Sequence, residues 1–170
     1  MRLPLNYIKE GDVCVEVGVW KGEFSRHILN KKPSKLYLVD PWLFQPEFLR
    51  RMYGGKIAKQ QHDMEVIYNL VDKTLGSLNN VELIRKKSDD VFSDFEDNSL
   101  DWVYIDGNHE YEFVLRDLEN FYPKIKSGGN LTGDDYTWNN PNGIQTVKKA
   151  VTEFVGKDRD WETLTQMDTD

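Results

Sequence analysis

The most constraining feature of the sequence is the stretch Asp101–Tyr136, which is typical of a strand, a helix and a second strand. Trp102–Ile105 is a short apolar run rich in β-branched and aromatic residues, as in buried strands, and it ends in Asp106. A second such run ends at Gly133. Units of this length are right-handed and put two parallel strands in one sheet. The stretch therefore predicts an α/β fold.

The segment between these strands has helical periodicity. Ser127–Gly129 is expected to end that helix, because glycine is the usual residue after a helix C-terminus. The spacing predicts one buried helical face, formed by Tyr111, Val114, Leu115, Leu118 and either Phe121 or Tyr122.

Three aspartates follow the two strands: Asp106 after the first, and Asp134 and Asp135 after the second. The carboxyl ends of parallel strands lie at one edge of a sheet, so we expect these side chains to share a cleft. Two like charges about 4 Å apart repel by roughly 4 kcal/mol at an effective dielectric near 20. A cation such as Mg²⁺, a shared proton or a basic partner would offset this repulsion. Alternatively, one aspartate caps a turn, another faces solvent, and only Asp106 lies in the cleft.

An earlier strand is predicted at Val13–Val17, followed by the glycine-containing loop Gly18–Gly22 and a helix near Glu23–Asn30. Such a turn brings backbone N–H groups and a positive helix end close to a ligand. The loop lacks the third glycine of a dinucleotide-binding fingerprint. Glu16 adds an acid, which suits a ligand with a positive amino group and points to S-adenosylmethionine.

Two further strands end in polar residues. Lys35–Val39 ends at Asp40, roughly 20 residues past the glycine loop, where an acid can accept hydrogen bonds from ribose hydroxyls. Its alternative role is to cap the following turn. Val81–Arg85 is followed by Ser88 and Asp89, which can meet an adenine amino group or cap a helix.

The middle of the chain contains a long connection, Leu43–Lys59, without clear periodicity. Connections of this kind are usually functional, and we interpret this one as part of a substrate-covering loop. Helical spacing resumes over Gln61–Leu75 and ends at Gly76, with His62 on the polar side as a surface residue.

The C-terminal part predicts a helix with Asn140 as its N-cap and Pro141 at its first position. Trp161–Leu164 could form a sixth strand. The helix is expected to end at Gly156 and to bury a face made of Ile144, Val147, Val151 and Phe154.

Length and charge narrow the class of protein. The 170 residues predict a single domain spanning residues 1–170. The net charge of −7, with scattered Lys and Arg, argues against a nucleic-acid partner. No apolar run approaches the roughly 20 residues of a membrane span, so we expect no membrane partner and a cytoplasmic location. The single cysteine, Cys14, is expected to pack inside a strand.

Several motifs together resemble one family. They are E-V-G-V-W-K-G, L-V-D-P-W, S-D-D, Y-I-D-G-N-H-E-Y-E-x-V-x-x-D-L, S-G-G and G-D-D-Y. The series resembles class I S-adenosylmethionine-dependent methyltransferases and is most similar to the small methyltransferases related to the macrolide-sugar O-methyltransferases. The resemblance extends from Val13 to about Phe154. It implies a Rossmann-like, doubly wound, mostly parallel sheet with helices on both faces. The family's last antiparallel strand is missing or very short here.

The resemblance also implies roles for individual residues. In metal-dependent members, the acids at these positions hold Mg²⁺, and the loop histidine acts as a base, with Asp106 also able to take the proton. The implied methionine-end residues are Glu16, Gly18 and Gly22; the ribose and adenine residues are Asp40, Ser88 and Asp89; the catalytic residues are Asp106 and His109; and the metal ligands are Asp106, Asp134 and Asp135.

The expected activity is therefore methyl transfer from S-adenosylmethionine to a hydroxyl of a small molecule, such as a sugar or a diol, with Mg²⁺ assistance. A partner copy completing the sheet would make the protein a homo-oligomer. The alternative is a non-catalytic, methyltransferase-like module for cofactor binding or assembly. A nicotinamide-dependent oxidoreductase is disfavoured, because the third glycine is missing.

Overall fold

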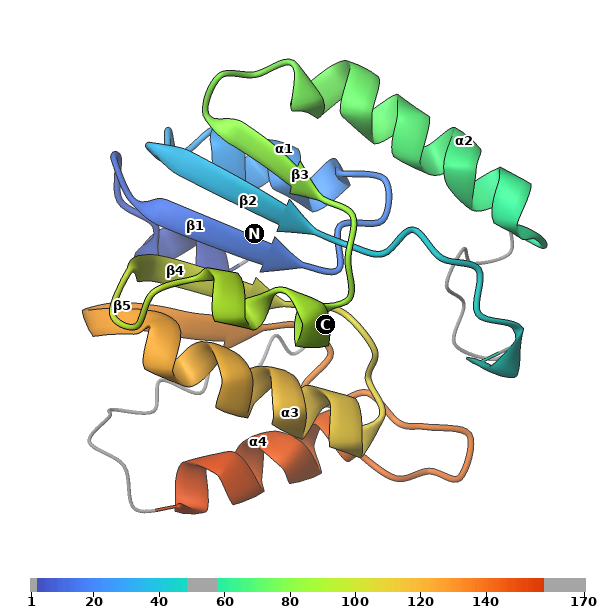
Figure 1. Ribbon diagram of the computed structural model, residues 1–170. Helices are drawn as coiled ribbons and strands as arrows, with labels where there is room; N and C mark the ends of the chain where they lie inside the picture. Colours follow the sequence, from blue (N-terminus) through green and yellow to red (C-terminus); the bar gives the residue numbers. More distant parts are fainter. Residues whose placement is uncertain (1–2, 49–57, 158–170) are drawn as a thin grey trace.

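Within the part of the chain that the structure describes, five parallel strands form one central sheet in the spatial order β3-β2-β1-β4-β5 (Figure 1). The computed structural model describes residues 3–48 and 58–157. The order reverses between β1 and β4, which is where ligands bind in open α/β sheets. The predicted doubly wound sheet is confirmed, with strands β1 (Val13–Val17), β2 (Lys35–Val39), β3 (Val81–Ile84), β4 (Leu100–Ile105) and β5 (Ile125–Gly133).

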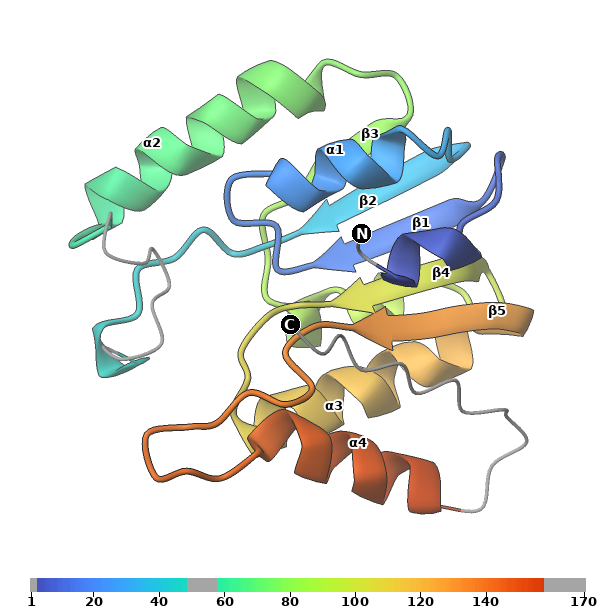
Figure 2. The same ribbon diagram turned by 180° about the vertical axis from the view of Figure 1, so that it is seen from behind.

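Helices cover both faces of the sheet (Figures 1 and 2). On one face lie α1 (Glu23–Leu29) and α2 (Gln61–Val71), and on the other α3 (Tyr111–Phe121) and α4 (Thr146–Gly156). Alternate residues of β1 serve the two cores: Cys14 packs with α1 and α2, and Val15 packs with α3 and α4. Cys14 is fully buried in the first of these cores, so its predicted packing role is confirmed, and this burial raises the pKa of its thiol to about 12.

The prediction that Ser127–Gly129 ends the third helix is wrong. The α-helix ends at Phe121 and continues as a 3₁₀ turn, Tyr122–Lys124, which contains Pro123. The glycines instead lie inside β5, where the register against β4 shifts after Leu100. A Cβ on Gly129 would lie 2.9 Å from the Asp101 carbonyl oxygen, so glycine allows the two strands to approach at this irregularity.

The predicted start of the last helix is also wrong. Asn140 caps a local turn rather than a helix, because its side chain accepts hydrogen bonds from the backbone N–H groups of Asn142 and Ile144, both at 3.0 Å. The helix begins at Thr146. Ile144 therefore falls outside it and is 50% exposed, whereas Val147 and Phe154 are buried as predicted.

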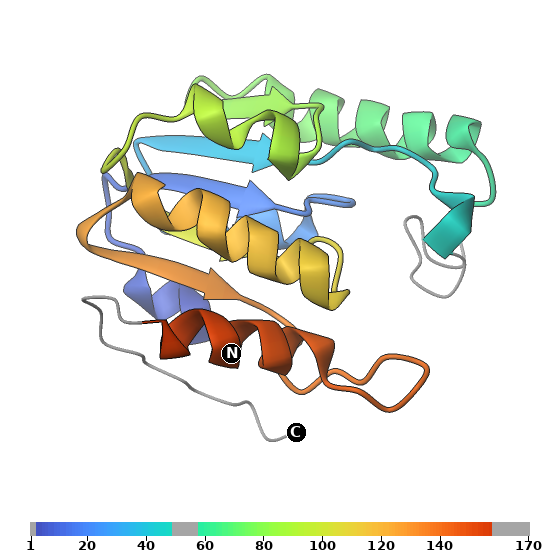
Figure 3. The ribbon, with the colours of Figure 1, turned by 60° about the horizontal axis from the view of Figure 1, so that its bottom comes forward.

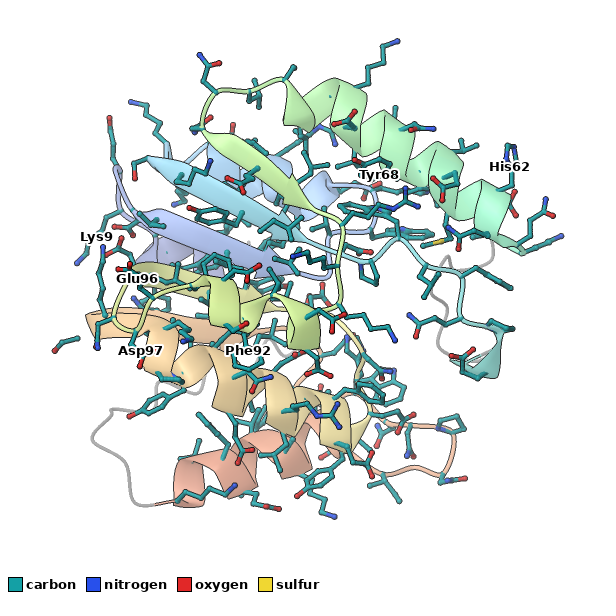
Figure 4. All side chains as sticks on the ribbon, viewed as in Figure 1. Lys9, His62, Tyr68, Phe92, Glu96 and Asp97 are labelled. Atoms are coloured by element: carbon teal, nitrogen blue, oxygen red, sulfur yellow. The ribbon has the colours of Figure 1, made fainter. Side chains whose placement is uncertain are left out.

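The helix predicted after the long connection is confirmed, with a small change in its boundaries. The helix predicted over Gln61–Leu75 is an α-helix to Val71 followed by a π turn, Asp72–Gly76. Figure 4 shows His62 on the outer side of α2, and it is exposed as expected. Residues 49–57 of the predicted covering loop and the proposed strand Trp161–Leu164 lie outside the described residues. Within residues 3–48 and 58–157, no helix combines the length and apolarity needed to cross a bilayer.

The carboxyl ends of all five strands meet at one edge (Figure 3). From this edge project the segment after β2 and the loop between β5 and α4. The loop after β1 packs directly on the exit of β4: Gly18 has φ +90°, and a Cβ there would lie 2.0 Å from the Asp106 carbonyl oxygen. Only glycine fits this contact, which sets the distance between the loop after β1 and the exit of β4.

Replacing this glycine tests the close approach. Gly18→Ala should lower the free energy of unfolding by roughly 3 kcal/mol or more, because it adds a steric overlap to an unfavourable φ. Gly11→Ala is the matched control: Gly11 has φ +92° but nothing within 4 Å of its Cβ position. The control should lose only about 1 to 2 kcal/mol in urea unfolding. Equal losses in both variants would contradict the packing argument.

Candidate active site

Asp40, at the end of β2, is an acid at the carboxyl edge that accepts three backbone hydrogen bonds. Its Oδ2 accepts the backbone N–H groups of Val19 and Trp20, both at 3.0 Å, and its Oδ1 accepts that of Trp42 at 2.7 Å. Burial raises the pKa of this carboxyl, and the three backbone hydrogen bonds lower it. Oδ1 keeps acceptor capacity for a ligand hydroxyl. Asp40 thus organises the glycine loop and still fits its predicted ribose role.

Two predicted cofactor residues, Glu16 and Gly22, lie at the two ends of the glycine loop and are held by contacts with neighbouring elements. Glu16 is 1% exposed and accepts a hydrogen bond of 2.5 Å from Ser25 Oγ on α1. Gly22 is the N-cap of α1 with φ 70°, and a Cβ there would lie 2.8 Å from the Leu75 side chain. Contact of these residues with the methionine end of a cofactor stays a prediction.

The other predicted cofactor residues line one cleft of about 260 Å³ at the switch point of the sheet. Its walls fit an adenosine-bearing cofactor. They combine Asp40, which keeps acceptor capacity near the glycine loop, with the Phe113 ring and the polar side chains of Ser88 and Asp117. The residues that matter most are Gly18, Asp40, Ser88, Asp89, Phe113 and Asp117.

Asp117 has no role among the predicted site residues, although it is the last acid of the motif Y-I-D-G-N-H-E-Y-E-x-V-x-x-D-L. It lies on α3, is 4% exposed and receives a hydrogen bond from the Ser88 side chain. Burial raises the pKa of its carboxyl to about 7. The available signal was its position: Asp117 lies three residues after Val114, on the apolar face of an amphipathic helix, where a charged residue requires a partner.

Asp89 points elsewhere than expected. Its Oδ2 accepts a hydrogen bond of 2.7 Å from Arg116, and its Oδ1 accepts one of 3.4 Å from Asn120. Both partners belong to α3. The Asp89 carboxylate is therefore held by the outer side of that helix, although the residue lines the cleft.

The second part of the edge is an acid cluster around His109. The ring nitrogen Nε2 lies 3.2 Å from Asp106 Oδ1, and Nδ1 lies 3.1 Å from Asp135 Oδ2. Burial is the main cause that raises the pKa of Asp106; Asp134 and Asp135 add to it, and the His109 hydrogen bond opposes it. Two of the three expected carboxylates are thus bridged by the predicted base.

Asp134 is turned away from this bridge. Its Oδ2 accepts a hydrogen bond of 2.9 Å from the Tyr104 hydroxyl, and its Oδ1 accepts the backbone N–H of Asp135 at 2.9 Å. Among the described residues, the ligand atoms that gather within 4.8 Å belong to Asp106, His109 and Asp135. The set brought together therefore contains an imidazole in the place expected for the third carboxylate.

The loop around His109 is anchored to its neighbours. Thr146 Oγ1, at the start of α4, donates a hydrogen bond of 2.7 Å to the His109 carbonyl oxygen. The Trp138 ring meets the imidazole edge-on, with centroids 5.9 Å apart. A hollow of about 1060 Å³ along β5 and α4 reaches His109, Asp134 and Tyr136 at one end. His109 and Asp134 can thus be reached from this hollow.

With this geometry established, comparison with known proteins identifies the class. The family model described as a methyltransferase domain matches residues 15–136, so the chain belongs to that family. Its domain is a class I S-adenosylmethionine-dependent methyltransferase domain. An uncharacterised protein of Acanthamoeba polyphaga mimivirus is 27% identical over 160 residues, which cover 90% of this chain. The chain spans 65% of that relative's length.

Solved structures share the fold at low sequence identity. A protein from Corynebacterium glutamicum has a TM-score of 0.59 at 14% identity, with 91% of this chain and 69% of that chain covered. An rRNA methylase from Streptococcus thermophilus gives 0.56 at 16%, covering 96% and 84%. Spermidine synthase from Thermotoga maritima gives 0.57 at 14%, covering 91% and 47%. The differing names of these proteins mean that the fold alone does not define the reaction.

The buried Asp117 gives a pH-dependent stability. Its pKa is raised in the folded state, so the native protein holds this proton more tightly than the unfolded chain, and its contribution to stability is lost as pH rises from about 4 to about 7. Asp117→Asn lacks this titration. Its stability relative to wild type should therefore rise across that window, by up to about 1.4 kcal/mol per pH unit, and level off above it.

Urea unfolding of both proteins at several pH values measures this difference. Asp90→Asn, on the same 3₁₀ turn as Ser88 but exposed, is the matched control. A stability difference between Asp117→Asn and wild type that does not vary with pH would contradict the burial of an ionisable Asp117.

Proposed function

We propose that this domain methylates a hydroxyl group of a small sugar-like or diol-like molecule, with His109 as the general base. The observation that carries the proposal is the imidazole held between Asp106 and Asp135 at the ends of β4 and β5. The motifs similar to those of macrolide-sugar O-methyltransferases support the same class of acceptor. The net charge of −7 further favours a small acceptor over nucleic acid.

The two carboxylates have different parts in this proposal. The Asp106 side chain is 27% exposed and that of Asp135 is 44% exposed, so Asp106 is on the more enclosed side of the ring. Asp106 can hold the Nε2–H and fix the ring orientation. Nδ1 then faces the more open side, where an acceptor hydroxyl can take the place of Asp135 as its partner. A base needs this kind of hydrogen-bond contact with the proton that it removes.

S-adenosylmethionine, when bound, supplies an electrophilic methyl group on its sulfonium. His109 would remove the hydroxyl proton as the acceptor oxygen bonds to that methyl group, while the methyl–sulfur bond breaks and S-adenosylhomocysteine leaves with its electron pair. The resulting imidazolium would be stabilised by Asp106 at Nε2 and by the nearby Asp135. Positioning contributes the rest of the rate, because the oxygen must be in line with the methyl group. The close packing of Gly18 on the Asp106 backbone keeps the cofactor cleft beside this base.

A divalent metal would use the same side chains. Asp106 and Asp135 each offer an oxygen near a His109 nitrogen, while Asp134 is engaged by Tyr104. Mg²⁺ prefers oxygen ligands, whereas a set with one imidazole also suits Mn²⁺ or Zn²⁺. A metal on these carboxylates would compete with the contacts that Asp106 and Asp135 make with His109. Mg²⁺ assistance is therefore part of the proposal as an activity that is measured separately.

Substitution of the base tests the proposed mechanism. With a panel of catechols and sugars as acceptors, His109→Gln should lower kcat by roughly 10²- to 10⁴-fold. S-adenosylhomocysteine affinity should change little, because His109 is not part of the 260 Å³ cleft. His62→Gln, on the outer side of α2, is the control and should keep full activity (Figure 4).

The outcomes separate the alternatives. Cofactor binding without turnover of any acceptor would favour the non-catalytic module. Full activity of folded His109→Gln would exclude this residue as the base. A requirement for Mg²⁺ that chelation removes and added metal restores would establish the metal-assisted form.

A further inference from the structure

Asp117 places a buried carboxyl group in the wall of the cofactor cleft. It lies one helical turn after Phe113 on α3, and both side chains line the cleft. A Cβ on Gly107 would lie 3.8 Å from Asp117 Oδ2, so the carboxyl is close to the loop that follows β4. Ser88, after β3, donates the hydrogen bond described above. The carboxyl therefore lies between the exits of β3 and β4.

This carboxyl has unused hydrogen-bonding capacity. Two carboxyl oxygens offer about four acceptor positions, and among the described residues Ser88 is the one side-chain partner that Asp117 has. Buried polar groups are normally hydrogen-bonded, because an unmet group loses its hydration without compensation. A polar group of a bound ligand would satisfy Asp117 without any rearrangement of the protein.

Asp89, the acid expected near adenine, is occupied instead. Arg116 and Asn120 hold both of its oxygens on the outer side of α3. Releasing the Asp89 carboxylate toward the cleft would break its contact with the Arg116 guanidinium. Asp117 needs no such release, since its side chain is already enclosed there.

We propose that Asp117, rather than Asp89, recognises the adenine of the cofactor by accepting a hydrogen bond from the exocyclic amino group. Ser88 orients the carboxyl, and Phe113 offers a ring to the purine. The inference rests on the cofactor cleft assigned above and makes Asp117 a specificity-determining residue. An adenine amino group donates to the carboxylate, whereas the oxygen at the same position of hypoxanthine would face it as a second acceptor.

Isothermal titration at pH 8 with S-adenosylhomocysteine and S-inosylhomocysteine tests this directly. Wild type should bind the adenine compound at least roughly tenfold more tightly, as expected for a hydrogen bond to a charged group. Asp117→Asn should reduce this ratio to within about threefold, because an amide can accept from the amino group or donate to the oxygen. Asp89→Asn and the exposed Asp90→Asn should keep the wild-type ratio.

Other results would overturn the proposal. Equal binding of both compounds to wild type, or loss of selectivity in Asp89→Asn but not in Asp117→Asn, would overturn the role of Asp117 alone. Failure of wild type to bind either compound would overturn the cofactor cleft as well. If Asp117→Asn does not fold, Ser88→Ala replaces it: a ratio lowered at least threefold supports the proposal, and an unchanged ratio in the folded variant contradicts it.

Discussion

The arrangement of the carboxyl edge depends on the Asp40 carboxylate. Its three hydrogen bonds join the loop after β1 to the exit of β2, and they fix Trp20 and Trp42, whose φ angles of 53° and 41° are uncommon outside glycine. The Trp42 indole N–H also donates to the Trp20 carbonyl oxygen at 2.9 Å. Asp40 thus holds in place the loop that forms one wall of the cleft proposed for the cofactor. Its Oδ1 still keeps acceptor capacity for a ligand.

At the ends of β4 and β5, repulsion between neighbouring carboxylates is offset by contacts with other side chains. Three aspartates lie at the ends of β4 and β5, and burial raises the pKa of Asp106. The His109 imidazole lies 3.2 Å from Asp106 and 3.1 Å from Asp135, and the Tyr104 hydroxyl donates a hydrogen bond to Asp134. The protein's own side chains can therefore hold the cluster together, and a proton shared within it would lower the repulsion further.

The sequence was informative about topology and poor at side-chain direction. The apolar runs and their terminal acids located all five strands, because strand burial and the carboxyl-edge rule depend only on residue type and order. The glycines at 128 and 129 were misinterpreted, because glycine serves both a helix end and an irregular strand. Asn140 was misplaced for a similar reason: its side chain can cap a turn as well as a helix. Local residue chemistry does not separate these cases, whereas tertiary pairing does.

The two acids near Ser88 show why site residues are harder to predict than folds. Asp89 follows a strand in a recognisable motif, yet the neighbouring Arg116 of α3 holds its carboxylate. Asp117 belongs to the same motif as Asp106 and His109 but lies in the middle of a helix, and the packing of α3 brings it into the cleft. Helix α3 thus determines which acid faces the ligand, because consecutive residues 116 and 117 point to different sides. Ligand recognition here follows from helix orientation as much as from the strand ends.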